Sequence, residues 1–140
     1  MPRTARASLG NWCYHVLNRG NGRAEVFHKP EDYAAFIDLF APACERIPMR
    51  VLGWCLMPNH VHLILVPADA DGLRRALAWA HRAYAGAIHA RRKRTGHFWQ
   101  GRFGAVVMDE EHLAAALRYV SLNPVRARLV DRPQDWRWSS

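Results

Sequence analysis

Two histidines separated by a single residue are the first feature of this sequence that could do chemistry. His60 and His62 follow a Pro58-Asn59 break, and Val61 lies between them. If the segment is a β-strand, alternate side chains point to the same face, so the two imidazoles project side by side. Two neighbouring imidazoles can hold one metal ion. They therefore form half of a candidate metal site.

A tyrosine and an asparagine near the end of the chain could complete that site. Tyr119 and Asn123 are four residues apart in a segment with helical periodicity, so they share one helix face about 6 Å apart along the axis. If this helix covers the histidine face, a phenol and an amide oxygen meet two imidazoles. Such a set suits phosphodiester chemistry, because a metal polarises the phosphate and the phenol attacks it.

Other tyrosines and histidines are weaker candidates. Tyr84 is the rival nucleophile, although its apolar neighbours favour core packing. His112, two turns before Tyr119, either approaches the site or is solvated at the helix start. We expect structural roles for Tyr14 and Tyr33. The histidines without a partner at a matching spacing are His81, His89 and His97.

The elements that would position these residues follow from periodicity and turn signals. We expect strands at 12–17, 49–57, 60–66 and 104–108, with a hairpin turn at 58–59. We expect helices at 30–47, at 71–94, and from 109 into Asn123-Pro124; the last has the apolar stripe Leu113, Leu117 and Val120. The order β-α-β-β-α-β-α is that of an α+β fold, a ferredoxin-like (RRM-like) antiparallel sheet with an added C-terminal helix that carries the tyrosine.

The strand at 60–66 has two chemically different faces. One face carries Val61, Leu63 and Leu65, and the other carries His60, His62, Ile64 and Val66. We expect the all-apolar face to pack on the core, which leaves the histidines on the opposite side of the sheet.

Length and composition limit the class of protein. The 140 residues predict one domain, 11–140, after a flexible basic arm at 1–10. No apolar run is long enough for a membrane span, and the first residues lack the apolar core of a signal peptide, so we expect a cytoplasmic protein. The cysteines, Cys13, Cys44 and Cys55, have no CxxC spacing and are expected to be small buried hydrophobes.

The charge indicates a nucleic-acid partner, with an ordinary basic protein as the alternative. Twenty Lys and Arg against twelve Asp and Glu give a net charge of +8, and all the basic residues except Lys29 and Lys93 are arginine. Two segments are candidates for DNA contacts, Arg91-Arg92-Lys93-Arg94 and the block with Trp99, Gln100 and Arg102. Their alternatives are a solvated helix end and an ordinary loop packed into the sheet.

Four blocks of sequence resemble the HUH single-tyrosine transposases, and most closely the REP-associated branch of that family. They occur in order along nearly the whole chain: Asn18-Arg19-Gly20-Asn21, Met57-Pro58-Asn59-His60-Val61-His62, His97-Phe98-Trp99-Gln100-Gly101-Arg102-Phe103, and Tyr119-Val120-Ser121-Leu122-Asn123-Pro124-Val125.

This resemblance implies a metal-dependent single-stranded DNA endonuclease and strand transferase. His60 and His62 would bind Mg²⁺ or Mn²⁺, with Asn123 as the third ligand, where wider relatives usually have Gln or His. Tyr119 would form a 5′-phosphotyrosine link and free a 3′-OH. The implied substrates are single-stranded DNA hairpins of the repetitive extragenic palindrome type. Monomer and homodimer both remain open.

Two other functions compete with this enzyme. An RRM-like module that binds nucleic acid without cutting it would carry aromatic side chains on the open sheet face, where this sequence has histidines. A structural metal domain is less favoured, because the chain offers only three plausible ligands and no cysteine set.

Overall fold

The computed structural model describes residues 10–140, so nine of the ten residues of the expected basic arm lie outside the described part. Its main elements are β1 (Cys13–Arg19), α1 (Pro30–Arg46), β2 (Met49–Met57), β3 (His60–Pro67), α2 (Gly72–Arg92), β4 (Gly104–Met108) and α3 (Glu110–Arg126). Short 3-10 turns occupy Asn21–Arg23 and Pro133–Asp135. The predicted α+β order is confirmed.

The four strands form one antiparallel sheet in the order β2-β3-β1-β4. The turn at Pro58-Asn59 joins β2 to β3, as the hairpin signal predicts. Strand β1 lies beside β3, with Leu17 opposite His62 and Arg19 opposite His60. The residues of β1 therefore flank both histidines.

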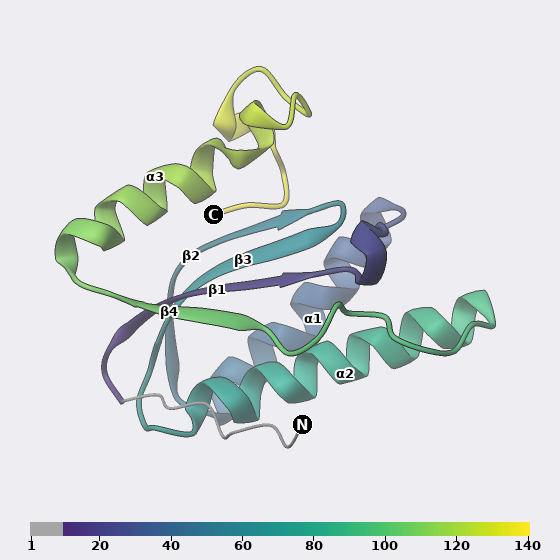
Figure 1. The fold of residues 1–140 in the computed structure, drawn as a ribbon, viewed down its shortest axis with the longest axis horizontal. Coiled ribbons are helices and arrows are strands. Elements are labelled where there is room, and N and C mark those ends of the chain that lie inside the picture. Colours follow the sequence, from purple (N-terminus) through teal and green to yellow (C-terminus); the bar gives the residue numbers. More distant parts are fainter. Residues whose placement is uncertain (1–9) are drawn as a thin grey trace.

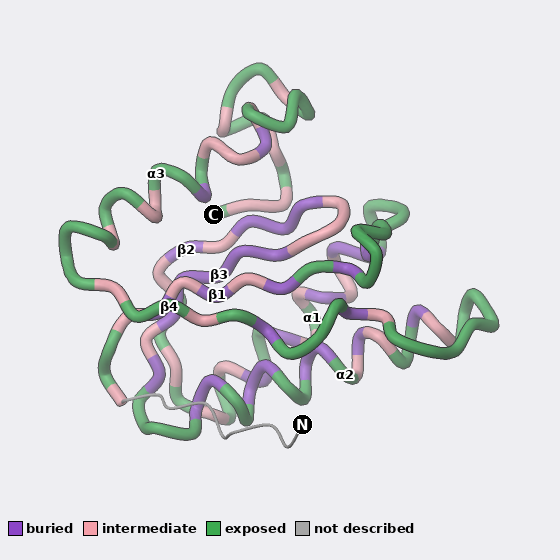
Figure 2. Tube along the Cα trace, viewed as in Figure 1, coloured by how far each residue is buried: buried purple, intermediate pink, exposed green. Residues whose placement is uncertain are grey.

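Helices cover both faces of this sheet, α1 and α2 on one side and α3 on the other (Figure 1). The main core lies under α1 and α2, where Val61, Leu63 and Leu65 are fully buried. The tube coloured by burial shows the central strands and the inner sides of α1 and α2 as the buried parts (Figure 2). The predicted core face of β3 is confirmed, and the histidines face α3.

A smaller apolar cluster holds α3 against the sheet. Cys55, Met57 and Ile64 from the strands contact Val120 of the helix, with Leu113 and Leu117 packed at the margin. At Gly53 the helix approaches closely, since an added Cβ would lie 2.9 Å from Leu117 Cδ2. The apolar stripe predicted for this helix is thus the surface that fixes its position.

Two element boundaries differ from the sequence-based expectation. Strand β1 continues through Arg19, into the predicted turn, because its last residues pair with Val61 and His60 of β3. Helix α3 continues through Pro124 to Arg126, and Pro124 is buried. Packing of the proline compensates for the backbone hydrogen bond that it cannot donate. Asn123 therefore lies inside the helix rather than at its end.

The C-terminal segment covers the outer edge of β2. Trp136 Nε1 donates to the Leu56 carbonyl at 3.0 Å, and the Leu56 N–H donates to the Trp138 carbonyl at 2.8 Å. These bonds satisfy backbone groups that an edge strand would otherwise expose. None of the helices described at residues 10–140 has the length and apolar character needed to cross a membrane.

Candidate active site

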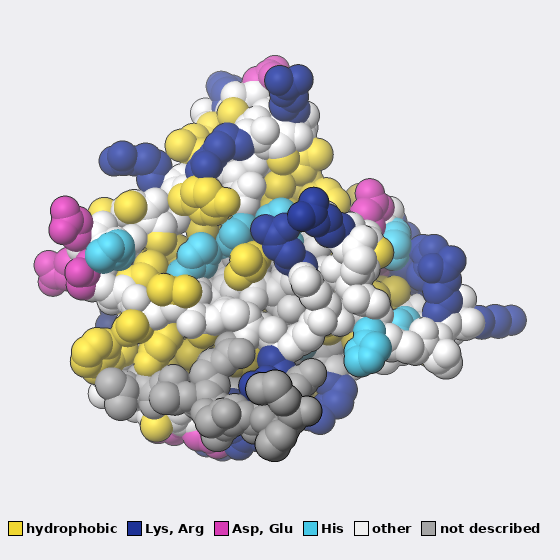
Figure 3. Space-filling model, in the orientation of Figure 1, with side chains coloured by type: hydrophobic (Ala, Val, Ile, Leu, Met, Phe, Trp, Pro, Cys, Tyr) yellow, Lys and Arg dark blue, Asp and Glu magenta, His cyan; other side chains and the backbone are white. Residues whose placement is uncertain are grey.

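The side chains of His60, His62 and Asn123 meet between the sheet and α3. Asn123 Nδ2 lies 2.6 Å from His62 Nε2 and 3.4 Å from His60 Nε2. The two imidazole rings are 4.9 Å apart and nearly perpendicular. Two neighbouring side chains of β3 and one from α3, distant in sequence, thus point their polar atoms at one small volume. A row of histidine side chains crosses this face beneath α3, with Lys and Arg side chains beside it (Figure 3).

The outward nitrogens of both imidazoles have hydrogen-bond partners of their own. His60 Nδ1 donates to Asn59 Oδ1 at 2.7 Å, and His62 Nδ1 lies 3.0 Å from His15 Nε2. The assignment that gives every N–H an acceptor places the protons on Nδ1 of both rings. Each Nε2 then presents a lone pair toward Asn123. Metal-binding histidines in proteins are commonly oriented by such outer partners.

Burial keeps these histidines neutral. Desolvation lowers the pKa of His62 to about 3, with further lowering by the nearby charges of His60, His15 and arginines. Desolvation, aided by the charge of Arg19, lowers the pKa of His60 to about 4. A neutral imidazole is the form that donates a lone pair to a metal ion.

Tyr119 contacts this group from the preceding turn of α3. Its ring lies edge-on to His62, with ring centroids 5.8 Å apart, and 44% of the residue is exposed. The guanidinium of Arg126 lies 4.1 Å from the ring centroid and donates to the Tyr119 carbonyl at 3.2 Å. The phenol is therefore next to the histidines, open to solvent and beside a cation.

The donor set has the chemistry of a site for a divalent cation. Two neutral imidazoles and one side-chain amide supply three donors, and rotating the amide of Asn123 by half a turn places Oδ1 where Nδ2 lies. Within residues 10–140 no group of three His, Cys, Asp or Glu side chains could hold a metal. A metal here would depend on the asparagine and would keep positions free for phosphate oxygens.

The rival tyrosine and the other histidines lie elsewhere. Tyr84 is fully buried and donates to the Val26 carbonyl at 2.6 Å, and desolvation raises the pKa of its phenol. Tyr14 and Tyr33 are also buried. His112 is exposed at the start of α3, where its Nδ1 lies 2.7 Å from Asp109 Oδ1. His81 is buried against Trp99 and Phe36. Tyr119 is thus the tyrosine that meets the paired histidines.

The basic cluster at the end of α2 divides into two parts. Arg91 forms a two-pronged ion pair with the buried carboxylate of Asp32. Its guanidinium is therefore already bound to a carboxylate, unlike one that is free to contact DNA. The other three cluster residues are exposed. Arg92 and Arg94 line a hollow of about 280 Å³ together with three histidines, His28, His89 and His97.

The block with Trp99, Gln100 and Arg102, which follows α2, also contains one buried and two exposed residues. Trp99 is buried, and its Nε1 donates to the His81 carbonyl at 3.0 Å. This residue therefore fits the alternative of an ordinary loop packed into the sheet, and not stacking on a base. Gln100 and Arg102 are exposed and line a hollow of about 360 Å³ with Arg19. Because Arg19 lies opposite His60 in the sheet, this hollow adjoins the paired histidines.

Three residues of the site were not identified by the sequence reasoning: His15, Arg19 and Arg126. The signal for His15 and Arg19 is their alternation along β1, which places them on the same face of the strand. Their meeting with His60 and His62 depends on β1 pairing with β3, which separation along the chain does not reveal. Arg126 lies beyond the proline at which the helix was expected to end.

Comparisons with known proteins agree with this fold. A protein of Haemophilus influenzae named as a REP-associated tyrosine transposase is 26% identical over 116 residues, which cover 75% of this chain and 66% of that protein. The structure of a REP-associated tyrosine transposase bound to a REP hairpin covers 99% of this chain and 82% of its own, with a TM-score of 0.79 at 20% identity. A transposase from Deinococcus radiodurans has a TM-score of 0.58 at 18% identity, covering 85% of this chain and 95% of its own.

The chain spans about two thirds of the length of the H. influenzae relative, and the two structural likenesses show a shared fold. The family described as Transposase IS200 like matches residues 8–123, which include the paired histidines, the tyrosine and the asparagine. The chain therefore belongs to the IS200-like transposase family.

Proposed function

We propose that this protein is a metal-dependent single-stranded DNA endonuclease and strand transferase that acts on DNA hairpins. The observation that carries the proposal is the contact of Tyr119 with His62, while Asn123 of the same helix lies 2.6 Å from His62 Nε2. A nucleophile and a set of metal donors thus share one site, as phosphoryl transfer requires. Hairpins of the repetitive extragenic palindrome type are the proposed substrates, because a structural relative is bound to a REP hairpin.

The proposed cofactor is Mg²⁺ or Mn²⁺ held by His60, His62 and Asn123. When bound, such an ion withdraws charge from the scissile phosphate and makes its phosphorus more electrophilic. The protein's own contribution is to hold both Nε2 atoms toward the substrate through the bonds to Asn59 and His15.

The proposed reaction exchanges one phosphodiester for another. The phenol oxygen of Tyr119 attacks phosphorus, the bond from phosphorus to O3′ breaks, and the phenol proton is lost while the leaving oxygen gains one. The 5′ end then remains on Tyr119, and a free 3′-OH can attack this link to rejoin strands. One phosphate ester bond is broken for each one formed, so no external energy source is needed. Arg126 beside the ring stabilises negative charge that develops on the phenol.

The proposed path of the DNA leads to this site from the end of α2. Arg92, Lys93 and Arg94 would contact the phosphates of the hairpin, since their exposed guanidinium and ammonium groups are suited to backbone contacts. Gln100 and Arg102 would guide the strand through the hollow beside Arg19 and His60. Arg91 and Trp99 would act indirectly, by holding these segments on the core.

Cleavage of labelled hairpins tests the nucleophile. The wild-type protein with Mn²⁺ should form a covalent band with DNA labelled at its 3′ end, because the fragment on the 3′ side of the break stays on the tyrosine, and Tyr119→Phe should abolish the band. The variant should still bind the hairpin in a gel-shift assay, because only the hydroxyl is lost. Tyr33→Phe, which changes a tyrosine on the other face of the sheet, is the matched control and should still cut.

A covalent adduct that persists in Tyr119→Phe would overturn the assignment of the nucleophile. If the wild-type protein bound hairpins tightly but never cut them with Mg²⁺ or Mn²⁺, the alternative of a non-catalytic RRM-like module would be favoured. The structure gives less support to that alternative, because α3 covers much of the sheet face on which RRM domains stack bases.

A further inference from the structure

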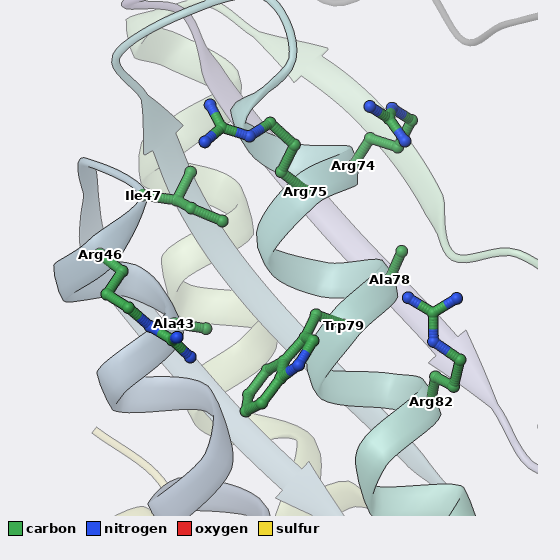
Figure 4. A pocket seen from close by; sticks show the side chains of 8 residues that line it. All are labelled: Ala43, Arg46, Ile47, Arg74, Arg75, Ala78, Trp79 and Arg82. Carbon is green, nitrogen blue, oxygen red and sulfur yellow. The ribbon is translucent and has the colours of Figure 1, made fainter.

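A groove between α1 and α2 contains several arginines and one tryptophan. Its volume is about 470 Å³, a size that can hold a small ligand, and the sheet separates it from His60 and His62. Figure 4 shows Trp79 between the two helices, with Arg46 extending toward it from α1 and Arg82 further along α2. The groove is thus a second basic surface, on the opposite side of the molecule from the candidate active site.

The groove residues of α2 repeat at helical intervals. Arg75 and Arg82 are seven residues apart, so they lie on the same side of the helix about 10 Å from each other along its axis. Trp79 lies between them, four residues after the first and three before the second, and is 38% exposed. The helix therefore presents a cation, an aromatic ring and a second cation in sequence along one side.

The charges of this groove are only partly neutralised. Arg74 pairs with Asp71 at 2.7 Å, and Arg75 lies 3.9 Å from Asp69. Neither Arg46 nor Arg82 forms an ion pair with a carboxylate in the part of the chain from residue 10 onward. The guanidinium of Arg46 lies over the Trp79 ring, 5.2 Å from its centroid, so α1 and α2 bring a cation and an aromatic ring together.

These features fit single-stranded nucleic acid better than other polyanions. Arginine binds phosphate oxygens through paired N–H groups, and an exposed tryptophan ring can stack on an unpaired base. A duplex would offer the phosphates but not the unpaired base, and an acidic peptide would offer carboxylates but no matching ring. A basic groove that contains an aromatic ring is the arrangement that binds single strands without sequence preference.

We propose that the groove formed by Arg46, Arg75, Trp79 and Arg82 is a second binding site for single-stranded DNA. One base would stack on the exposed part of Trp79 beside Arg46, and the phosphates on either side would contact Arg75 and Arg82. The site would hold a strand apart from the one being cut at Tyr119. It does not require the chemistry proposed for Tyr119, so each proposal can fail without the other.

Binding of a hairpin-free oligonucleotide tests this site. A fluorescently labelled oligo-dT is titrated with the full chain carrying Tyr119→Phe, and anisotropy is measured. Adding Arg75→Ala and Arg82→Ala together should weaken binding roughly tenfold and reduce the steepness of its salt dependence by about 1.4 log-log units, for two phosphates of a single strand. Arg50→Ala, an exposed arginine on β2 outside the groove, is the matched control for charge.

Substitution of the tryptophan separates stacking from charge. Trp79→Ala should weaken oligo-dT binding roughly tenfold, whereas Trp79→Phe should restore most of the affinity because it keeps an aromatic face. Oligonucleotides that contain 5-iododeoxyuridine should crosslink on irradiation to peptides of α1 and α2. Melting temperatures near that of the parent protein would show that the variants are folded.

Unchanged affinity in the groove variants, together with crosslinks confined to α3 and β3, would refute the second site. Competition by polyglutamate at the same charge concentration as oligo-dT would identify the groove as an acidic-peptide surface, and this result too would overturn the proposal. Cleavage by the groove variants of a hairpin with only a short single-stranded flank should equal that of wild type when Tyr119 is present.

Discussion

The side chain of His15 contacts the ring nitrogen of His62 that lies away from Asn123. Its Nε2 lies 3.0 Å from His62 Nδ1, and the two rings stack with centroids 5.2 Å apart. This contact fixes the ring orientation in which His62 Nε2 points toward Asn123. A histidine on β1 thus belongs to the site through its contact with His62.

Removing this partner should weaken metal binding. His15→Ala should lower Mn²⁺ affinity about tenfold or more, the range measured for outer partners of metal-bound histidines, and His15→Gln should recover part of it. Calorimetric titration of the protein with Mn²⁺ measures the effect without DNA. His112→Ala, an exposed histidine on α3, should leave the affinity unchanged. Equal affinities in His15→Ala and wild type would show that His62 is held by other contacts.

The apolar stripe of α3 determines whether the tyrosine and asparagine reach the histidines. Val120 lies between them in sequence and is 3% exposed, packed on Cys55, Met57 and Ile64. Because Tyr119 and Asn123 are on the same helix, a tilt of α3 would move both relative to the sheet. The positions of Tyr119 and Asn123 relative to the histidines therefore depend on this packing.

Shortening Val120 tests this dependence. Val120→Ala should lower the free energy of unfolding by about 2 kcal/mol, because it removes two buried methyl groups and leaves a small cavity. Chemical denaturation measures the loss, and Leu129→Ala is the exposed control. A loss no larger than that of the control would mean that the α3 interface is not tightly packed.

The ion pair of Asp32 with Arg91 joins the start of α1 to the end of α2. Burial alone would raise the pKa of Asp32, but hydrogen bonds from Arg91 and the His28 backbone, together with the arginine's charge, lower it overall. A carboxyl with a lowered folded-state pKa stabilises the fold above its ordinary pKa. That contribution is lost as the pH falls through the folded-state value.

Replacement of this carboxylate should therefore have a pH-dependent cost. Asp32→Asn should lower the free energy of unfolding at pH 7 by about 2 kcal/mol, since the variant loses charge-assisted hydrogen bonds in a buried position. The difference from wild type should shrink as the pH falls below about 4. Thermal melts between pH 7 and pH 2 measure it, and a difference that is constant over this range would contradict the sign of the pKa shift.

The whole molecule carries its positive charge on more than one surface. Arginine side chains line three separate hollows: at the end of α2, beside Arg19, and in the groove between α1 and α2. Phosphate contacts of this kind release counterions from DNA, so affinity depends steeply on salt. The overall charge should then be visible in the salt response of hairpin binding.

The salt response of hairpin binding should count the phosphates that the protein contacts. Each contact should add about 0.9 to the steepness of a log-log plot of affinity against salt, and Arg92→Ala with Arg94→Ala should reduce it by about 2. Fluorescence anisotropy over a range of salt concentrations gives the slope. Arg132→Ala, an exposed arginine paired with Asp135, is the control. A flat response in wild type would mean that the positive charge has no role in DNA binding.

The order of the elements, their faces and the family were predictable from sequence. Periodicity indicates local structure, and alternation in β3 separates His60 and His62 from the core residues without knowledge of the fold. The helical spacing of Tyr119 and Asn123 likewise places them on one face. These features depend on near neighbours in the chain, so the residues themselves determine them.

Only the tertiary structure determined which distant residues meet. The pairing of β1 with β3 brings His15 to His62 and Arg19 beside His60, and packing keeps α3 helical through Pro124. Trp99 donates to the His81 carbonyl and Arg91 pairs with Asp32, although the residue types of both had suggested contact with DNA. Such contacts depend on strand register and on competition for buried partners, which are properties of the whole fold and not of any local pattern.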